Sequence, residues 1–422
     1  MIGSPLVVAQ QARARMEAML ATLREGSSDK SAPVAHASRM PAVADVVITA
    51  CEVTSAHGTG TLLLRIFHDN AEIVSVRTSN FYEGRQSFGA AQLCLPLAQS
   101  SRPEIESWLK WHFSNTRVRR IVALPYLPAD PVVAATLHKL TGAPLCTYIM
   151  DDKNVCADGI DDALMADLLG HSGLRLVISP EMRDAYQKKY GMGFWVMPPL
   201  VPEALLRRDP VPFPAGADPR RGVLLGNIWG QRWLDTLRRV FKGNAYHIDW
   251  FCNQKDPAGL VFDRDEMIKD GITFHEPVDE RALPELLSRY AFAVVPTDTL
   301  DGDSPAAVQA IAELSLPSRI PTMIATSHLP ILVIGSPQTC AARFVMRFQL
   351  GEIAPYEAAA VTASLDRLLQ SKVQADIRRR AAVVAGQLSA EDSAAWIWRS
   401  LAMGEPCDMR YETLMPADAP VG

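Results

Sequence analysis

The sequence lacks the patterns that mark several common classes of protein. Its seven cysteines include no Cys-x-x-Cys pair, so we expect no disulfide scaffold and a reduced, cytoplasmic chain. Neither a His-Glu-x-x-His nor a Gly-x-Ser-x-Gly motif occurs, which argues against zinc hydrolases and serine esterases. No apolar run approaches the roughly 20 residues that cross a bilayer.

A strong charge of either sign is also missing. The 42 Lys and Arg residues and 47 Asp and Glu residues give a net charge of -5 and a pI near 6.0, so no nucleic-acid partner is expected. Hydrophobic residues make up 48% of the 422 residues. That length predicts two domains with full cores, since a domain averages roughly 150 residues.

The first 45 residues are expected to precede the folded domains. Residues 7–24 have the pattern of a short amphipathic helix without a basic stretch before an apolar core, so no signal peptide is expected. Residues 26–45, rich in Ser, Ala and Pro, predict a flexible connector. The sequence leaves open whether peripheral contact with the inner face of a membrane, or assembly into a homo-oligomer, accompanies the cytoplasmic location.

Short apolar runs alternate with helical patterns along two stretches of the chain. This alternation predicts βαβ units and parallel sheets, so we expect an α/β protein with two Rossmann-like, doubly wound domains facing a cleft. The expected parts are an N-terminal helix and connector at 1–45, an N-terminal domain at 46–200, a proline-rich linker at 201–221, a C-terminal domain at 222–388, a helix packing back across the junction at 389–404 and a loose tail at 405–422. The expected strands cover 46–51, 72–76, 120–124, 145–150, 174–179, 194–197, 222–228, 246–252, 272–275, 292–296, 331–334 and 343–346.

Two polar segments follow strands in the first half. Gly58-Thr59-Gly60 is an incomplete dinucleotide fingerprint, and the sequence leaves a tight turn and a ligand loop equally open. The neighbouring His57 is a candidate acid or base, with a structural role as the alternative. Asp151 and Asp152 end another strand, where ligands bind parallel sheets; they predict either a substrate-facing carboxylate or a helix cap and a salt bridge to Lys153.

The second half carries the stronger indication of an anion site. The apolar run Phe292 to Pro296 is followed by Ser315-Leu-Pro-Ser-Arg-Ile-Pro321, which reads as the start of a helix. Backbone N–H groups at a helix start, together with the guanidinium of Arg319, suit phosphate oxygens. These features predict a nucleotide diphosphate site. Gly226, Asn227 and Arg232 repeat the strand-loop-helix pattern, although Arg232 taken alone is as easily a solvated arginine.

Asp301-Gly302-Asp303 matches an Asp-x-Asp metal pattern. We favour a solvated turn, or contact with sugar hydroxyls, over a Mg²⁺ or Mn²⁺ site, because patterns of three residues often arise by chance. No resident metal or other cofactor is therefore expected.

The order of these parts resembles the GT-B glycosyltransferases, in particular the retaining group (family 4-like, group 1) that includes glycogen synthase-like and lipopolysaccharide or capsule transferases. The resemblance extends over about residues 46–403. The segments that carry it are Tyr148 to Asp152, Leu176 to Tyr190 with Val196 to Val201, Gly271 to Val278 with Ala291 to Pro296, and Ser315 to Ile320. The last of these is similar to a Pro-Ser-Lys segment of the family, with Arg319 in place of lysine.

The resemblance implies a glycosyltransferase with a UDP- or GDP-linked sugar donor on the C-terminal domain and an acceptor on the N-terminal domain. By position, the family's donor phosphates would be lined by Gly226, Asn227 and Arg232. The base would contact Glu276 and Pro277, and the diphosphate would contact Ser318 and Arg319. Asp151 or Asp152 faces the acceptor and sugar, with His57 as a further catalytic candidate and Gly58 and Gly60 on the acceptor side.

The implied enzyme is a hexosyltransferase that needs no metal, acting on a glycan, glycolipid or protein. One departure is that the family's Glu-x7-Glu pattern is absent, and Asp301, Asp303 and Glu313 stand in that region. The alternatives are therefore a nucleotide-sugar epimerase or hydrolase on the same fold and a non-catalytic GT-B scaffold protein.

Overall fold

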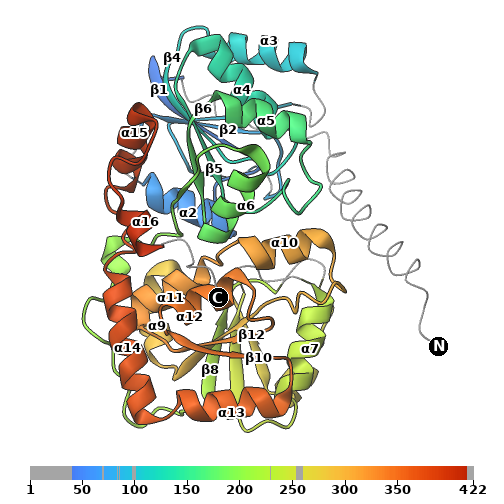
Figure 1. Ribbon diagram of the computed structural model, residues 1–422, viewed down its shortest axis with the longest axis vertical. Coiled ribbons are helices and arrows are strands. Elements are labelled where there is room, and N and C mark those ends of the chain that lie inside the picture. The colour runs from blue at the N-terminus through green and yellow to red at the C-terminus, as the bar shows by residue number, and fades with distance from the viewer. Residues whose placement is uncertain are drawn as a thin grey trace, which may run out of the picture.

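The computed structural model describes residues 40–68, 71–82, 84, 86–96, 101–228, 230–252 and 260–415. Most of the expected N-terminal helix and connector, residues 1–39, lies outside this range. The described chain forms two parallel sheets, of seven and six strands. Helices cover both sheets, and the two helix-covered sheets stack along the long axis of the molecule (Figure 1).

The first sheet has the strand order β3-β2-β1-β4-β5-β6-β7. Its register places Val46 beside Val74 on one neighbour and Ile121 on the other. The inner strands are fully buried apolar runs, as expected for a parallel sheet covered on both faces. The strands are β1 (Val43–Thr49), β2 (Ile73–Arg77), β3 (Ala91–Cys94), β4 (Arg117–Ala123), β5 (Leu145–Ile149), β6 (Ser172–Val177) and β7 (Trp195–Val196), and the helices are α2 (Gly58–Ile66), α3 (Arg102–Phe113), α4 (Ala129–Thr141), α5 (Asp162–His171) and α6 (Pro180–Tyr190).

The second sheet has the order β10-β9-β8-β11-β12-β13. In each sheet the strand order reverses beside the first strand, at β1 and at β8, and this switch point is where open α/β sheets bind ligands. The strands are β8 (Arg221–Leu225), β9 (His247–Phe251), β10 (Ile272–His275), β11 (Phe292–Pro296), β12 (Ile331–Ile334) and β13 (Gly351–Ala354). The helices are α7 (Gln231–Phe241), α8 (Arg264–Lys269), α9 (Leu283–Ser288), α10 (Ala306–Leu314), α11 (Arg319–Ser327), α12 (Cys340–Arg347), α13 (Ala358–Leu368) and α14 (Ser371–Ala385), with 3-10 turns at η2 (Glu203–Leu205) and η3 (Glu280–Ala282).

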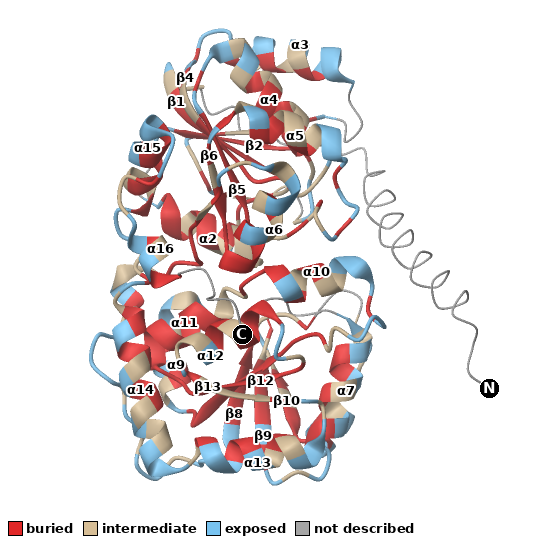
Figure 2. Cartoon of the chain, in the orientation of Figure 1, coloured by how far each residue is buried: buried red, intermediate tan, exposed pale blue. Residues whose placement is uncertain are grey.

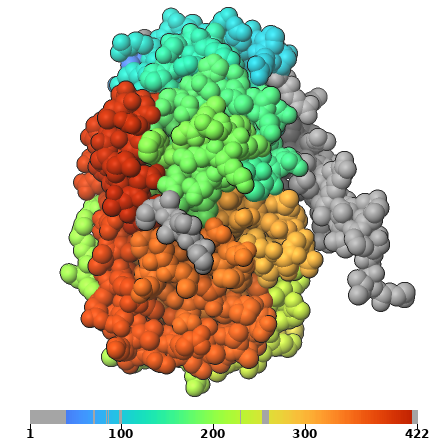
Figure 3. Space-filling model, in the orientation of Figure 1, coloured from blue at the N-terminus to red at the C-terminus, as the bar shows by residue number. Residues whose placement is uncertain are grey.

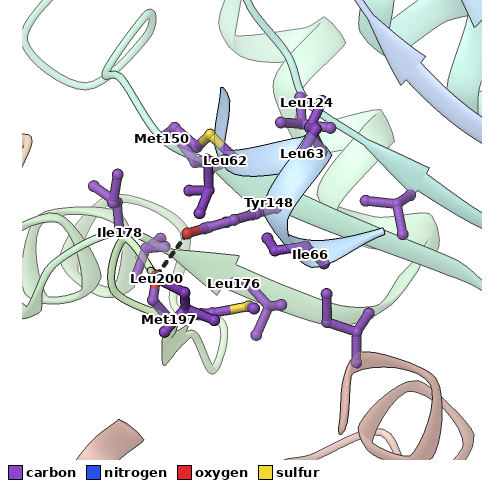
Figure 4. Packing of buried hydrophobic residues seen from close by; sticks show 14 of the residues in the cluster. Leu62, Leu63, Ile66, Leu124, Tyr148, Met150, Leu176, Ile178, Met197 and Leu200 are labelled. Carbon is purple, nitrogen blue, oxygen red and sulfur yellow. Dashed lines mark hydrogen bonds between the residues drawn. The ribbon is translucent and has the colours of Figure 1, made fainter. Parts of the chain in front are cut away.

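Buried residues concentrate in the sheets and on the helix faces that contact them (Figure 2). In the first domain, Leu62, Leu63 and Ile66 of α2 are buried in the main core. They lie in the same close-packed group as Tyr148, whose hydroxyl donates to the Met197 carbonyl at 2.6 Å (Figure 4). This packing fixes the direction of α2, and so the position of its N-terminal turn.

The chain crosses between the domains twice, at neighbouring places. Val201 in the first crossing pairs with Ser389 in the second. After the second crossing, α15 (Ser393–Met403) packs on β6 of the first domain. There the Trp398 ring lies under the Arg120 guanidinium, 4.3 Å from its centroid. The last helices, coloured red, run along one side of both domains (Figure 3).

Two buried side chains of the second domain hold the linker. His328, in a left-handed conformation at the end of α11, accepts from the Val211 N–H at 3.0 Å and donates to the Arg207 carbonyl at 2.9 Å. Arg378 of α14 donates to the carbonyls of Val211 and Ser327. The linker is thereby attached to the second domain at Arg207 and Val211.

Three elements differ from the sequence-based expectations. The strand expected at 343–346 lies in α12, because Thr339 caps a helix there, and the strand follows at β13. Strand β3 at the edge of the first sheet was not expected. The described part of the tail expected to be loose contains α16 (Arg410–Leu414), which buries Tyr411 and Leu414, and residues 416–422 lie outside the described range. Among the described helices, none is long and apolar enough to span a membrane.

Candidate functional site

The switch points of the two sheets meet where the N-terminal turn of α2 faces that of α11. Gly58 lies so close to Ser318 that a Cβ atom on Gly58 would be 3.3 Å from the Ser318 hydroxyl oxygen. Gly58 belongs to the first domain and Ser318, the N-cap of α11, to the second. We call this contact, with the side chains around it, the interdomain junction.

Arg319 places a cation at this junction. Its Nη1 donates to the carbonyls of Leu225 at 3.0 Å and Asn227 at 2.9 Å. Its Nε is buried and has no hydrogen-bond partner among the described residues. Burial lowers the pKa of Arg319 to about 10, so the guanidinium remains charged at neutral pH. Among the described residues no carboxylate forms an ion pair with it, and an anion at this place would meet an unneutralised charge.

Gly226 and Asn227 form the turn that Arg319 contacts. Gly226 has φ 81°, a left-handed conformation that glycine adopts without strain. The Asn227 amide oxygen accepts from the Cys252 thiol at 3.2 Å. The structure therefore brings together four of the residues predicted to hold the donor: Gly226, Asn227, Ser318 and Arg319.

Arg232 has partners of its own. Its Nη2 lies 3.0 Å from Asp301 and 3.2 Å from Asp303, the two acids of the Asp-x-Asp pattern. Because Arg232 is 46% exposed, these ion pairs are weak. A small hollow of about 30 Å³ that opens to solvent lies beside it. Among the described residues, no group of three or more His, Cys, Asp or Glu side chains is arranged to hold a metal.

Glu276 and Pro277 are exposed in the loop after β10. Strand β10 is separated from β8 only by β9. Two spacings of about 4.8 Å between neighbouring strands therefore place the loop after β10 roughly 10 Å from the Gly226 turn. Beside them the rings of Phe251 and His275 stack at 4.5 Å with an interplanar angle of 12°. This aromatic pair could not be predicted from the sequence, because Phe251 and His275 come from different strands.

His57 caps the start of α2, and the catalytic role considered for it stays a prediction. Its Nε2 lies 2.7 Å from the Glu52 carbonyl, and its Nδ1 accepts from the Gly60 N–H at 3.2 Å. The Nε2 must therefore carry the hydrogen, which makes this imidazole neutral and leaves neither nitrogen free for substrate. The ring also stacks on Tyr82 at 4.8 Å.

This arrangement predicts a dependence of stability on pH. Burial lowers the pKa of His57 below its usual 6.5, so the folded state favours the neutral ring more than the unfolded state does. His57 therefore contributes its full stability above pH 6.5, and the contribution falls as the pH drops from 6.5 toward the folded-state pKa. When the pH is lowered from 7.5 to 5.5, the free energy of unfolding in urea is expected to fall more for wild type than for His57→Asn. The difference is up to about 1.4 kcal/mol per pH unit. Equal losses would contradict this role.

Asp152 also has a structural role, and the catalytic role considered for it stays a prediction. Its carboxylate is buried, and both of its oxygens accept hydrogen bonds from the backbone of the following loop. The donors are the N–H groups of Asn154, Val155, Cys156 and Ala157 and the hydroxyl of Tyr186. Five donors satisfy both oxygens, so Asp152 organises residues 154–157.

Gly60 is likewise a packing residue. A Cβ at this position would lie 2.2 Å from the Thr54 carbonyl oxygen and 2.7 Å from the Thr54 nitrogen. Because only glycine fits against that backbone, Gly60 forms a tight turn, and the acceptor contact considered for it stays a prediction. Gly58 retains a place at the junction.

Asp151 lies near a hydrogen-bonded pair that the sequence did not reveal. The Tyr126 hydroxyl oxygen is 2.6 Å from the Thr59 hydroxyl oxygen. Burial and the charge of Asp151 raise the pKa of Tyr126 well above 10. Tyr126 comes from the loop after β4, far from Asp151 in sequence, and no motif marked it.

No protein-family model matches the chain, and no curated protein sequence matches it significantly. Solved structures do match its fold. HepE of Anabaena in complex with UDP and glucose matches with a TM-score of 0.59 at 10% identity, over 85% of this chain and 100% of HepE. WaaG, a glycosyltransferase involved in lipopolysaccharide biosynthesis, matches with a TM-score of 0.55 at 12% identity, over 85% of this chain and 99% of WaaG.

The chain has the GT-B fold. A UDP-N-acetylglucosamine 2-epimerase also matches, with a TM-score of 0.50 at 10% identity over 86% of this chain and 95% of the epimerase. At these identities the matches establish architecture alone, so the chemistry has to be argued from the residues of this chain.

Polar contacts hold the two GT-B domains together beside the junction. Arg65 of α2 is buried and bonds to Glu280 of the second domain, with its Nε 2.7 Å from a carboxylate oxygen. The same guanidinium donates to Thr322 of α11 at 3.2 Å and to the Leu200 carbonyl at 2.7 Å. At a second contact, the Ser179 hydroxyl donates to the Leu314 carbonyl at 2.5 Å. These contacts bring α2 alongside α11.

Proposed function

We propose that this protein is a glycosyltransferase that moves a sugar from a nucleoside diphosphate sugar to an acceptor hydroxyl. The observation that carries the proposal is Arg319, a cation without a carboxylate partner among the described residues, at the N-terminal turn of α11 in a GT-B fold. A diphosphate would supply the missing negative charge. At the helix start the Ile320 N–H already donates to the Pro317 carbonyl and Pro321 has no N–H, so the diphosphate would accept from the N–H groups of Ser318 and Arg319.

In this proposal the C-terminal domain holds the donor. Ser318 and Arg319 contact the diphosphate, with the Gly226 and Asn227 turn beside them. Glu276 and Pro277 contact the base, next to the stacked rings of Phe251 and His275. Arg232 reaches a phosphate by releasing Asp301 and Asp303, which are exposed and weakly bound.

The reaction then requires stabilisation of the charge that develops on the leaving diphosphate. Fixed N–H groups and a guanidinium provide this stabilisation without reorganisation, so we propose that no metal is required. We propose a UDP- or GDP-linked hexose as donor, and HepE, which binds UDP and glucose, supports UDP as the first choice. Asp151 faces the acceptor and the sugar, and the acceptor is a glycan, a glycolipid or a protein.

A thermal-shift screen tests the donor site. Purified protein is heated with UDP, GDP, ADP, CMP or TDP, with and without Mg²⁺. At 100 times Kd a ligand adds about 2.7 kcal/mol to the native state, which corresponds to a rise in Tm of roughly 5 °C. We expect one diphosphate to give this rise, and Arg319→Ala to abolish it. Arg289→Ala, which removes an exposed arginine paired with Glu285, is the control and should keep the rise.

The outcomes separate the candidate functions. Sugar transfer requires an acceptor hydroxyl, whereas an epimerase or a hydrolase turns over the donor in water without one. Binding of a nucleotide without turnover of any donor would indicate a scaffold protein. No shift with any of the five nucleotides would contradict the glycosyltransferase proposal.

A further inference from the structure

The loop that joins β11 to α10, residues 297–305, begins beside the proposed diphosphate site, and we call it the acidic loop. The carbonyl of Pro296, the last residue of β11, accepts from Arg319 Nη2 at 3.5 Å. The next residue, Thr297, lines the small hollow beside Arg232. The base of the acidic loop therefore lies between the two arginines that are proposed to bind phosphate.

The far part of the acidic loop bonds to Arg232 through three side chains. Arg232 Nη2 donates to Asp301 at 3.0 Å and to Asp303 at 3.2 Å, and its Nη1 lies 3.4 Å from the Ser304 hydroxyl oxygen. Asp301 also accepts from the Asp303 N–H at 3.0 Å and from the Thr299 hydroxyl at 2.8 Å. These two hydrogen bonds lower the pKa of Asp301 below its usual value, so its carboxylate is charged at neutral pH when it meets the guanidinium.

These contacts can be released at little cost. Arg232 is 46% exposed, Asp301 44% and Asp303 75%, and ion pairs between side chains so exposed to water are weak. The backbone of Leu300 has φ 55°, a left-handed conformation that is strained for a residue with a side chain. The loop therefore holds Arg232 by weak bonds and through a strained turn.

We propose that Asp301 and Asp303 occupy Arg232 when no donor is bound, and that the donor diphosphate displaces them. The proposal rests on the glycosyltransferase function proposed above and adds a control on its donor site. Carboxylate and phosphate oxygens accept from the same N–H groups of a guanidinium, so the acidic loop and the diphosphate compete for Arg232. Two carboxylates that stayed in place would also repel the diphosphate.

A consequence follows for donor affinity. Part of the free energy of diphosphate binding is used to release the loop, so the apparent Kd is weaker than it would be with Arg232 unoccupied. The acidic loop is then an autoinhibitory contact. Two other roles predict a different effect of removing its charges: metal ligands would make binding weaker in the presence of Mg²⁺, and contacts to sugar hydroxyls would leave binding of a nucleotide without a sugar unchanged.

Calorimetric titration with UDP and with GDP, in EDTA and in Mg²⁺, measures the effect. The double variant Asp301→Asn with Asp303→Asn keeps the shape of both side chains and removes their charges. We expect it to lower the Kd of the nucleotide that binds by about 5-fold in EDTA and in Mg²⁺ alike, since one exposed ion pair is worth about 1.4- to 5-fold in an equilibrium constant. Glu285→Gln, which removes an exposed charge on α9, is the control and should leave Kd unchanged.

The same two changes in an Arg232→Gln background separate competition from simple repulsion. There the gain should disappear, because the loop no longer has an arginine to occupy. Asp303→Asn alone, at the more exposed of the two acids, should lower Kd about 2-fold, and it keeps the test available if the double variant fails to fold.

An unchanged or weaker affinity in the folded Asn variants would overturn the competition and leave the transferase proposal standing. A gain of equal size in the Arg232→Gln background would overturn it as well, because repulsion alone would then explain the result. If wild type and every variant fail to bind either nucleotide, the proposed donor site is wrong, and the role of the acidic loop with it.

Discussion

Replacing Arg378 by Ala is expected to lower the free energy of unfolding by about 4 kcal/mol, because each buried polar group left unpaired costs about 1–3 kcal/mol. Only 3% of this side chain is exposed. It donates to the carbonyls of Val211, Ser327 and Tyr290 at 3.0–3.4 Å and to the Gln374 side chain at 3.0 Å. Removing the guanidinium leaves these acceptors buried and releases the linker.

Urea unfolding at pH 7 measures this effect. The matched control is Arg379→Ala, one position further along α14, where the side chain is 69% exposed and pairs with Asp376. We expect the control to lie within about 0.5 kcal/mol of wild type. If the two variants lose similar stability, Arg378 does not anchor the linker.

Replacing Glu280 by Ala is expected to destabilise the contact between the domains by about 2 kcal/mol. Arg65 is 5% exposed and Glu280 33%, so the variant leaves a nearly buried guanidinium without its carboxylate. Breaking a fully buried pair costs about 3–5 kcal/mol, and the exposure of Glu280 reduces that value. Because the pair joins the two domains, part of the cost is relieved when the domains separate.

Small-angle scattering and urea unfolding together check this expectation. Glu280→Ala should raise the radius of gyration, while Glu285→Ala, which removes an exposed carboxylate on α9, should not. The double variant Arg65→Met with Glu280→Gln removes both charges and should recover part of the lost stability. An unchanged radius and an unchanged stability in Glu280→Ala would show that the pair does not hold the domains together.

Much of the fold could be predicted from the sequence because buried parallel strands are continuous apolar runs. Segments such as Phe292 to Pro296 and Ile331 to Ile334 have the predicted boundaries in the structure. The predicted elements were wrong where tertiary contacts, and not the local sequence pattern, determine the secondary structure. Arg343 to Met346 reads as a strand, but the Thr339 cap starts a helix before it. Strand β3 is short and contains Gln92, so only its pairing with β2 identifies it.

The site was predicted less completely, for a different reason. Arg319 and Ser318 could be located because a helix start after a buried strand is visible in the sequence. His57 and Asp152 carry the residue types of catalytic groups, yet local backbone groups occupy their polar atoms, and a sequence does not show where those groups point. Tyr126 was missed because its hydrogen-bond partner Thr59 approaches it only in the folded domain.

Because α15 returns to the first domain, that domain is formed by two separate stretches of the sequence. Trp398 lies against Phe67 at 5.6 Å and under Arg120, and Leu401 lies against Gly173. A protein fragment that ends at residue 200 would therefore lack α15, which covers part of the first domain, and would leave apolar surface exposed to solvent. Domain exchange between relatives would have to cut the chain in two places, at the paired crossings near Val201 and Ser389.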